Sequence, residues 1–335
     1  MAFVLVALAL FIFALDLMKT GAQDAAPLFR ARMRIQNPLD ALGFGWLFAY
    51  VVLSGSPVAA ATLTFLSGGV ISTTDAYAMI AGSRLGASMV VILLGFLYVL
   101  RGRQTTRGLT TGLLAMLVTA TIYVPALILG LAVLEAGVVP TVAFEVPVLD
   151  AIGGIYGPTV EAIGARLPGG WIFLLGTVTM VGSFSLFDRG LPDISLGGAT
   201  LGERFVFRPI VMFLAGLAVT ALTMSVSVSV GLLVPVSARG LVRRENVVPY
   251  VMGCNVSTFV DTLFVALLLR TAEGFTVVLI EMLSVAVVSL VVLAIGFETY
   301  RHVLDRAADW AVDNGRNLAA SLGALVLVPL LLVAC

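Results

Sequence analysis

The chain has 335 residues, of which 60% are hydrophobic and 11% are charged. In an ordinary soluble domain about a quarter of the residues are charged, so this composition excludes one and indicates an integral membrane protein. The formal net charge is zero, which excludes the basic surface by which proteins bind nucleic acids.

Apolar segments long enough to cross a bilayer, about 20 residues in a helix, recur along the chain. The first could instead be a secretory signal, but it lacks a basic start, and Lys19 follows it in place of a small-residue cleavage site. We therefore expect a multi-pass protein of the cell membrane. The expected spans are residues 2–18, 77–100, 110–134, 171–187, 247–269, 275–297 and 318–334.

Two pairs of shorter apolar segments have the length and punctuation of re-entrant hairpins. These pairs are 40–53 with 57–71, and 211–224 with 228–238. Each arm is too short to cross the bilayer alone, and Gly55-Ser56-Pro57 between the first two arms is typical of a turn.

The two hairpins belong to an internal repeat. Residues 38–86 have a second copy 171 positions later (209 − 38 = 171). Duplicated apolar segments that glycine and serine interrupt are typical of transporters with inverted repeats, whose broken helices expose backbone groups inside the membrane. We therefore expect an all-α membrane protein with two inverted-topology repeats, each with a re-entrant helical hairpin and a broken transmembrane helix. The matching residues are Pro38 with Pro209, Gly45 with Gly216, Ser54 with Ser225, Ser56 with Ser227, Gly69 with Gly240 and Gly82 with Gly253.

Polar segments divide the chain into parts. The stretch from 21 to 37 should form an interfacial helix, 135–170 an ordered loop, and 298–317 a solvated or interfacial helix with its charges on one face. The expected parts are an N-terminal helix with its interfacial helix (1–37), repeat 1 (38–100), connecting spans with the loop (101–187), repeat 2 (188–270) and C-terminal spans (271–335).

Hydroxyl groups mark the break in each repeat, as Ser54-Gly55-Ser56 in the first copy and Ser225-Val226-Ser227 in the second. A helix that starts at such a break presents free N–H groups and the positive end of its dipole, which suits an anion. Carbonyls at broken C-terminal ends, with side-chain oxygens, suit Na⁺. The alternative is that small residues merely let membrane helices pack closely. Their repetition at one spacing favours a binding site.

The order of these motifs resembles the type II sodium/phosphate cotransporter family. The resemblance covers roughly residues 15–100 and 185–270 and implies phosphate transport with Na⁺ coupling. The chain departs from the family's Gln-Ser-Ser-Ser signature, with Leu53 and Met224 at the Gln positions and Gly55 and Val226 at the middle serines. The resemblance therefore implies the scaffold more firmly than the substrate. Its motifs here are Asn37-Pro38, Ser54-Gly55-Ser56, Gly69 and Gly82–Ser88, then Pro209, Ser225–Ser227, Gly240 and Gly253–Thr258.

Arg84 stands where the family's first unit has an asparagine, an amide that Asn255 keeps in the second copy. An arginine inside a membrane segment is costly and usually marks a pathway or a buried ion pair. The alternative is that Arg84 lies at the interface and extends to water. We expect it to bind the anion or to replace a bound Na⁺, with Asp261 or Asp75 as its partner. Arg84→Ala should then abolish uptake while the protein still folds.

Asp261 and Glu281 are the carboxylates deepest in apolar runs. Each is a candidate cation or proton site, because carboxylates inside membranes are rare and costly. For Glu281, early in its span, an interfacial position is an equally good interpretation. The resemblance and the residue chemistry together give a substrate site of Ser54, Gly55, Ser56, Ser225, Ser227 and Arg84, and an ion site of Asn255, Ser257, Thr258 and Asp261.

An intramembrane enzyme is the main alternative class. His302 is the single histidine and lies in a polar segment, so a two-histidine metal site is not available. Lys19 is poorly placed to activate a serine of a later repeat. Cys254 and Cys335 are the two cysteines, which offer no metal cluster and no obvious disulfide.

The sequence therefore predicts a secondary active transporter, and not an enzyme, that moves a small inorganic anion, phosphate above all. Na⁺ is a candidate coupling ion, no other cofactor is expected, and the partners are the lipid bilayer and the anion. A non-transporting sensor or scaffold remains an alternative, because both signature glutamines are lost. A transporter of a different solute without Na⁺ coupling is the other.

Overall fold

The computed structural model describes residues 2–28, 35–100, 107–137, 139, 157–190, 208–223, 226, 229–230 and 244–334. Within these ranges the protein is all-helical and has no strand. Six stretches of helix are long and apolar enough to cross a membrane, which confirms a multi-pass membrane protein. They are Val6–Asp24, Leu109–Ala136, Gly169–Leu186, Arg244–Leu268, Ala272–Ile295 and Gly315–Ala334.

Every predicted span coincides with a helix, and the polar segment 298–317 also contains one. The span expected at 247–269 consists of two helices in direct succession. The helices are α1 (Ala2–Asp24), α3 (Pro38–Val52), α4 (Ser56–Ser67), α5 (Thr73–Leu100), α6 (Arg107–Ala136), α8 (Gly169–Gly190), α9 (Pro209–Thr223), α11 (Arg244–Ser257), α12 (Phe259–Leu268), α13 (Ala272–Ile295), α14 (Phe297–Asp313) and α15 (Gly315–Ala334).

The polar segments differ from expectation in two places. At the start of the stretch 21–37, where an interfacial helix is expected, α1 continues to Asp24, and Gly21 packs closely against α8. A turn follows at Ala25, and residues 26–28 are helical again. Residues 35–37 are not helical, since Asn37 is the N-cap of α3, and 29–34 lie outside the described residues. The connection 135–170, expected as a loop, contains a helix at 157–164.

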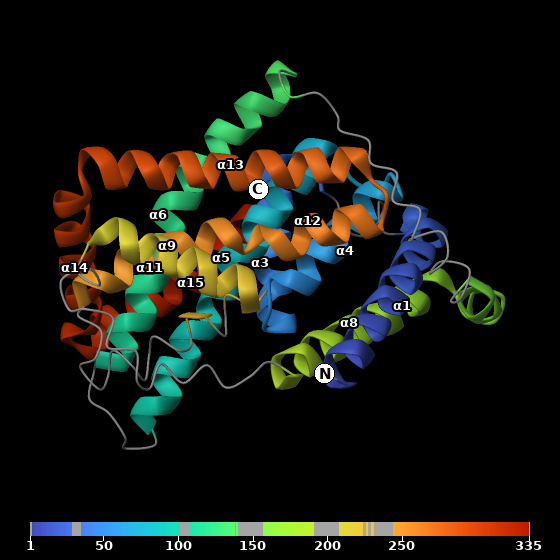
Figure 1. The fold of residues 1–335 in the computed structure, drawn as a ribbon, viewed down its shortest axis with the longest axis horizontal. Helices are drawn as coiled ribbons and strands as arrows, with labels where there is room; N and C mark the ends of the chain where they lie inside the picture. Colours follow the sequence, from blue (N-terminus) through green and yellow to red (C-terminus); the bar gives the residue numbers. More distant parts are fainter. Residues whose placement is uncertain are drawn as a thin grey trace.

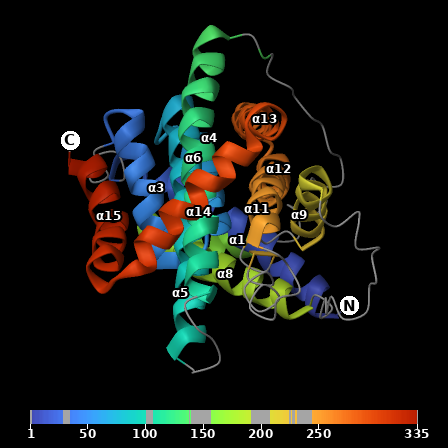
Figure 2. The same cartoon turned by 90° about the vertical axis from the view of Figure 1, so that its left-hand side faces the viewer.

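Helices from distant parts of the chain lie side by side (Figure 1). The pair α1 and α8 packs along its length, and α13 runs beside α12 and also contacts α6. In the view from the side, α6 stands upright between α3 and the α11–α12 pair (Figure 2). The last helix, α15, returns to α3, where the Tyr50 hydroxyl donates to the Leu325 carbonyl at 2.9 Å.

The break between α3 and α4 follows from local chemistry. Asn37 caps α3 by accepting hydrogen bonds from the backbone N–H groups of Leu39 and Asp40. The helix ends at Leu53, which has a left-handed φ of 56°. Three residues later α4 begins at Ser56, with Pro57 in its first turn, where a missing N–H costs nothing.

The end of α4 explains one of the repeated glycines. Gly69 has a φ of 65°, and its N–H donates to the Leu66 carbonyl at 2.9 Å, while the Val70 N–H donates to the Phe65 carbonyl at 2.8 Å. This is the bond pattern of a helix terminated by a left-handed residue, a position that glycine adopts without strain.

Two helix pairs, α3 with α5 and α9 with α11, pack through glycines in the same way. A side chain at any of these glycines would collide with a backbone carbonyl of the facing helix, so close packing requires glycine here. The contacts of the two pairs correspond at the 171-residue spacing. Gly45 meets Met79 and Gly82 meets Leu42 in the first pair, and Gly216 meets Tyr250 and Gly253 meets Phe213 in the second.

Candidate functional site

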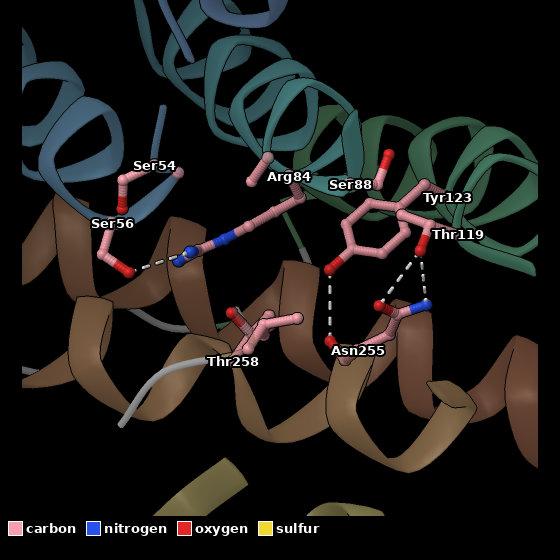
Figure 3. A pocket seen from close by; sticks show the side chains of 11 residues that line it. Ser54, Ser56, Arg84, Ser88, Thr119, Tyr123, Asn255 and Thr258 are labelled. Carbon is pink, nitrogen blue, oxygen red and sulfur yellow. Dashed lines mark hydrogen bonds between the residues drawn. The ribbon is translucent and has the colours of Figure 1, made fainter. Parts of the chain in front are cut away.

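A small cavity lies where the α3–α4 break faces α5, α6 and the junction of α11 with α12 (Figure 3). Its volume is about 40 Å³. On the same measure a water molecule needs about 10–15 Å³, so the cavity has room for a few waters or a small ion. The break contributes Ser54, Gly55 and Ser56, α5 contributes Arg84, Ala87 and Ser88, α6 contributes Thr119 and Tyr123, and the second half of the chain contributes Val226, Asn255 and Thr258.

Arg84 is the charged residue of the cavity lining. Only 5% of it is exposed, so it does not extend to water at an interface. Its Nη2 lies 3.3 Å from the Asp261 carboxylate and also donates to the Thr262 hydroxyl. Of the two expected partners, Asp261 therefore pairs with Arg84, whereas Asp75 accepts from the Ser72 hydroxyl at 2.6 Å in the first turn of α5.

The rest of the guanidinium is held more loosely. Nη1 donates to the Ser56 hydroxyl over 3.4 Å, and the two side chains point toward one another in Figure 3. The Phe259 ring lies under the guanidinium, 5.2 Å from its centre, at a distance typical of a cation–π contact. Nε is buried and has no hydrogen-bond partner among the described residues. Arg84 is thus fixed on one side and retains donor capacity on another.

The start of α4 also faces the cavity. Gly55 is the N-cap of this 12-residue helix, and no side chain caps it. The first N–H groups of a helix have no partner within the helix and carry the positive end of its dipole. Two sources of positive potential, the α4 start and Arg84, therefore meet on the same side of the cavity.

Hydrogen bonds between α6 and α11 form the opposite wall. The Thr119 hydroxyl lies 3.3 Å from both the Oδ1 and the Nδ2 atoms of Asn255, and the Tyr123 hydroxyl donates to the Asn255 backbone carbonyl at 3.1 Å. Both α6 side chains are buried and lie one helical turn apart. They fix the position of Asn255 at the cavity.

Residues related by the repeat line the same cavity. Gly55 and Val226, Arg84 and Asn255, and Ala87 and Thr258 are each 171 positions apart, and all six line it. The correspondence extends from the helix packing to the cavity wall.

Six of the ten predicted site residues line this cavity, namely Ser54, Gly55, Ser56, Arg84, Asn255 and Thr258. Asp261 lies behind them as the ion-pair partner of Arg84. Ser257 is buried, and its hydroxyl donates to the Gly253 carbonyl at 3.3 Å instead of facing the cavity. Ser225 and Ser227 lie outside the described residues.

The contribution of α6 to the cavity was not predicted from the sequence. Thr119 and Tyr123 lie in a long apolar helix outside the duplicated segments, where threonine and tyrosine usually indicate packing. A usable signal was their spacing of one turn, which places two hydroxyls on one helix face.

The fold and the cavity define a multi-pass, all-helical membrane protein with a buried polar site. Residues 10–139 match the family model described as Na⁺/Pi-cotransporter, which confirms the resemblance over the first repeat. The matched residues include the α3–α4 break and Arg84, and the second repeat lies outside them. Neither the curated proteins nor the solved structures contain a match to the chain.

Proposed function

We propose that the protein is a secondary active transporter of a small inorganic anion, with phosphate as the first candidate. The observation that carries this proposal is the buried Arg84 guanidinium, which faces a polar cavity shared by two sequence-related groups of helices. The family match over residues 10–139 supports a transporter rather than an enzyme.

In this proposal each repeat is an inverted unit with a re-entrant hairpin. At about 1.5 Å per residue, α3 and α4 are shorter than the hydrocarbon core of about 30 Å, since they have 15 and 12 residues. The corresponding glycine contacts and the three pairs of cavity residues support a shared ancestry of the two units. Movement of one unit against the other would open the cavity to alternate sides of the membrane.

The anion would bind between the α4 start and Arg84. The free N–H groups at Gly55 and Ser56, the Ser54 and Ser56 hydroxyls and the unpaired Nε of Arg84 are donors, and oxyanions accept hydrogen bonds from such groups. Asn255 and Thr258 would supply oxygens from the second unit, to the anion or to a coupling cation. Ser225 and Ser227 would complete the site by symmetry with Ser54 and Ser56.

The size of the cavity fits a closed state of this cycle. A volume of about 40 Å³ suits a few water molecules, so admission of a tetrahedral oxyanion requires the two units to separate. Asp261 would keep Arg84 in place while the site is empty, since an unpaired buried charge is strongly unfavourable.

Uptake into liposomes tests the proposal. Purified protein is reconstituted, and uptake of radiolabelled phosphate, sulfate and similar anions is measured with and without an inward Na⁺ gradient. Gradient-driven accumulation of one of these anions is the expected result. Flux without accumulation would indicate a channel, and no flux of any anion would favour the non-transporting sensor or scaffold. The comparison with and without Na⁺ shows whether this ion is coupled.

A further inference from the structure

Glu281 on α13 is a buried carboxylate that takes no part in the cavity. It is 1% exposed, and neither of its carboxylate oxygens has a hydrogen-bond partner among the described residues. Its side chain therefore does not reach water. Glu281 lies nine residues after Ala272 in a 24-residue apolar helix, about 14 Å along it at 1.5 Å per residue. This is close to the middle of a membrane span.

A carboxylate at such a position is costly when it is charged and unpaired. Elsewhere in the molecule an ion-pair partner offsets the cost of a buried charge, as Arg84 does for Asp261. Glu281 has electrostatic contact with Arg84 but no ion pair with it. A proton is the smallest ligand that neutralises a carboxylate, and it needs no coordination shell of oxygens.

Among the described residues, the groups around Glu281 include no cation other than Arg84. From α5 and α6, Tyr77 and Tyr123 interact with it besides Arg84. The α4 helix carries no titratable residue, and Asp261 of α12 is paired with Arg84.

The titratable residues of α11 and α14 have partners of their own. On α11, Tyr250 and Cys254 are hydrogen-bonded to Ser229. The charged residues at the α11 start and on α14 pair with one another, as Arg244 does with Asp305 and Asp309, and Arg301 with Glu298.

Around the Arg84–Asp261 ion pair, the charges of the described residues therefore sum to one uncompensated negative charge when Glu281 is ionised. Arg84 and Asp261 cancel, and Glu281 remains. An ionised Glu281 competes with an incoming anion for the field of Arg84. A protonated Glu281 does not.

We propose that Glu281 is a proton-binding site that couples anion transport to the movement of protons. This inference rests on the proposed anion transport and names its coupling ion. The carboxylate of Glu281 takes up one proton in the state open to the acidic side, the anion binds at Arg84, and both are released on the other side. The carboxylate is thereby regenerated, with no change of oxidation state. Because linkage is reciprocal, the bound anion in turn favours the protonated form of Glu281.

The test compares exchange with proton-driven uptake in proteoliposomes. Exchange of radiolabelled phosphate at equal pH on both sides reports anion binding and transport alone. Net uptake with the medium more acidic than the lumen, in the absence of Na⁺, reports proton coupling. The wild-type protein is expected to take up phosphate about 5-fold faster or more under the gradient, the low end of typical coupling between two sites.

The Glu281→Gln variant keeps the shape of a protonated carboxyl but cannot release a proton. It is expected to exchange phosphate and to lose the stimulation by the gradient. The pH gradient changes the ionisation of phosphate equally in the experiments on the variant and on the wild type. The difference between their uptake rates therefore reports the effect of the Glu281 side chain alone. Ser289→Ala is the matched control, because Ser289 is on the same helix, is fully buried and also has an unpartnered oxygen. This variant should keep the stimulation.

Each outcome decides between the proposals. If the wild-type protein exchanges phosphate but the gradient has no effect, or if Glu281→Gln keeps the full stimulation, the coupling proposal is wrong and the transport proposal stands. If the wild type exchanges no phosphate, sulfate or similar anion, the transport proposal fails, and the coupling proposal fails with it. If Glu281→Gln loses all exchange, Glu281→Asp is measured in its place. The coupling proposal requires this variant to show proton-driven uptake with a shifted pH profile, and it is wrong if the variant does not.

Discussion

The first helix group, α3 to α5, and the second, α9 to α12, have the same backbone packing but different chemistry at the cavity. In both, glycines at equivalent positions bring two helices into backbone contact. At the cavity, Arg84 in the first group corresponds to Asn255 in the second. The second group supplies most of the partners of that arginine, namely Asp261, Thr262 and Phe259, whereas the first group supplies Ser56.

In the proposed transporter, duplication would have fixed the scaffold, and later substitution would have divided the binding chemistry between the copies. A symmetric pair of amides would make equal contributions. A cation in one copy and its carboxylate in the other make each copy dependent on its counterpart. Substitutions on the two sides can therefore separate what the copies share from what each contributes alone.

Removal of the charge from the first copy should have the largest effect. Arg84→Ala leaves Asp261 buried without its ion-pair partner, with a hydrogen bond from the Thr262 hydroxyl remaining. The loss of one partner of a buried ion pair costs about 3–5 kcal/mol. The protein should therefore be markedly destabilised, contrary to the expectation that this variant folds normally. The Arg84→Leu/Asp261→Leu double variant removes both charges and should recover most of the loss. Thermal unfolding in detergent measures both. Equal stability of Arg84→Ala and wild type would contradict a buried ion pair.

The shared packing should fail in the same way in both copies. Gly82→Ala and Gly253→Ala each place a methyl group against a backbone carbonyl of the facing helix, at Leu42 and Phe213. Overpacking typically costs about 1–3 kcal/mol, and a backbone atom cannot move aside as a side chain can. Both variants should unfold earlier on heating. Gly323→Ala, which meets nothing within 4 Å, is the control. Loss of stability in one copy alone would argue against equivalent packing.

The amide of the second copy should matter less for stability than the arginine of the first. Asn255→Ala removes the contact with Thr119, whose hydroxyl still donates to the Ala115 carbonyl at 2.9 Å. A net loss of about 0.5–1.5 kcal/mol is expected for one neutral hydrogen bond. The same unfolding experiment checks this value. A loss as large as that of Arg84→Ala would show that the two copies are more alike than their side chains suggest.

The smallest effect is expected at Leu53, which ends α3 with a φ of 56°. A left-handed conformation costs a residue with a side chain roughly 1–2 kcal/mol, whereas glycine adopts it freely but loses about 0.5–1 kcal/mol of chain entropy. Leu53→Gly should therefore raise stability slightly, by less than about 1 kcal/mol. A clear destabilisation would mean that the leucine side chain contributes packing despite being 56% exposed.

Much of this arrangement was predictable from the sequence because the residues involved recur at the 171-residue spacing. Hydropathy predicted the spans. Arg84 and Asn255 occupy equivalent positions in the two copies, as Ser54 and Gly55 do with their counterparts, and this correspondence predicted a common site. Hydropathy has no comparable signal for a contact between Arg84 and Asp261, which are 177 positions apart. From the sequence, Asp75 was an equally plausible partner of Arg84. In the structure Asp75 instead accepts a hydrogen bond from the Ser72 hydroxyl at the start of α5.

The parts that the sequence did not reveal depend on helix rotation. Whether Glu281 faces protein or interface depends on how α13 is turned, and its neighbours in sequence are apolar on both sides. The same holds for Thr119 and Tyr123, which lie in a helix that the repeat does not mark. Tertiary packing decides these orientations.

Equilibrium binding of radiolabelled phosphate to the purified protein tests the central claim most directly, namely that the cavity between the two copies binds an anion through Arg84. The wild type should bind saturably. The Arg84→Leu/Asp261→Leu variant, shown by thermal unfolding to be folded, should bind at least about 10-fold more weakly, as expected for the loss of a charged hydrogen-bond donor. Binding of phosphate by that double variant with wild-type affinity would contradict the claim.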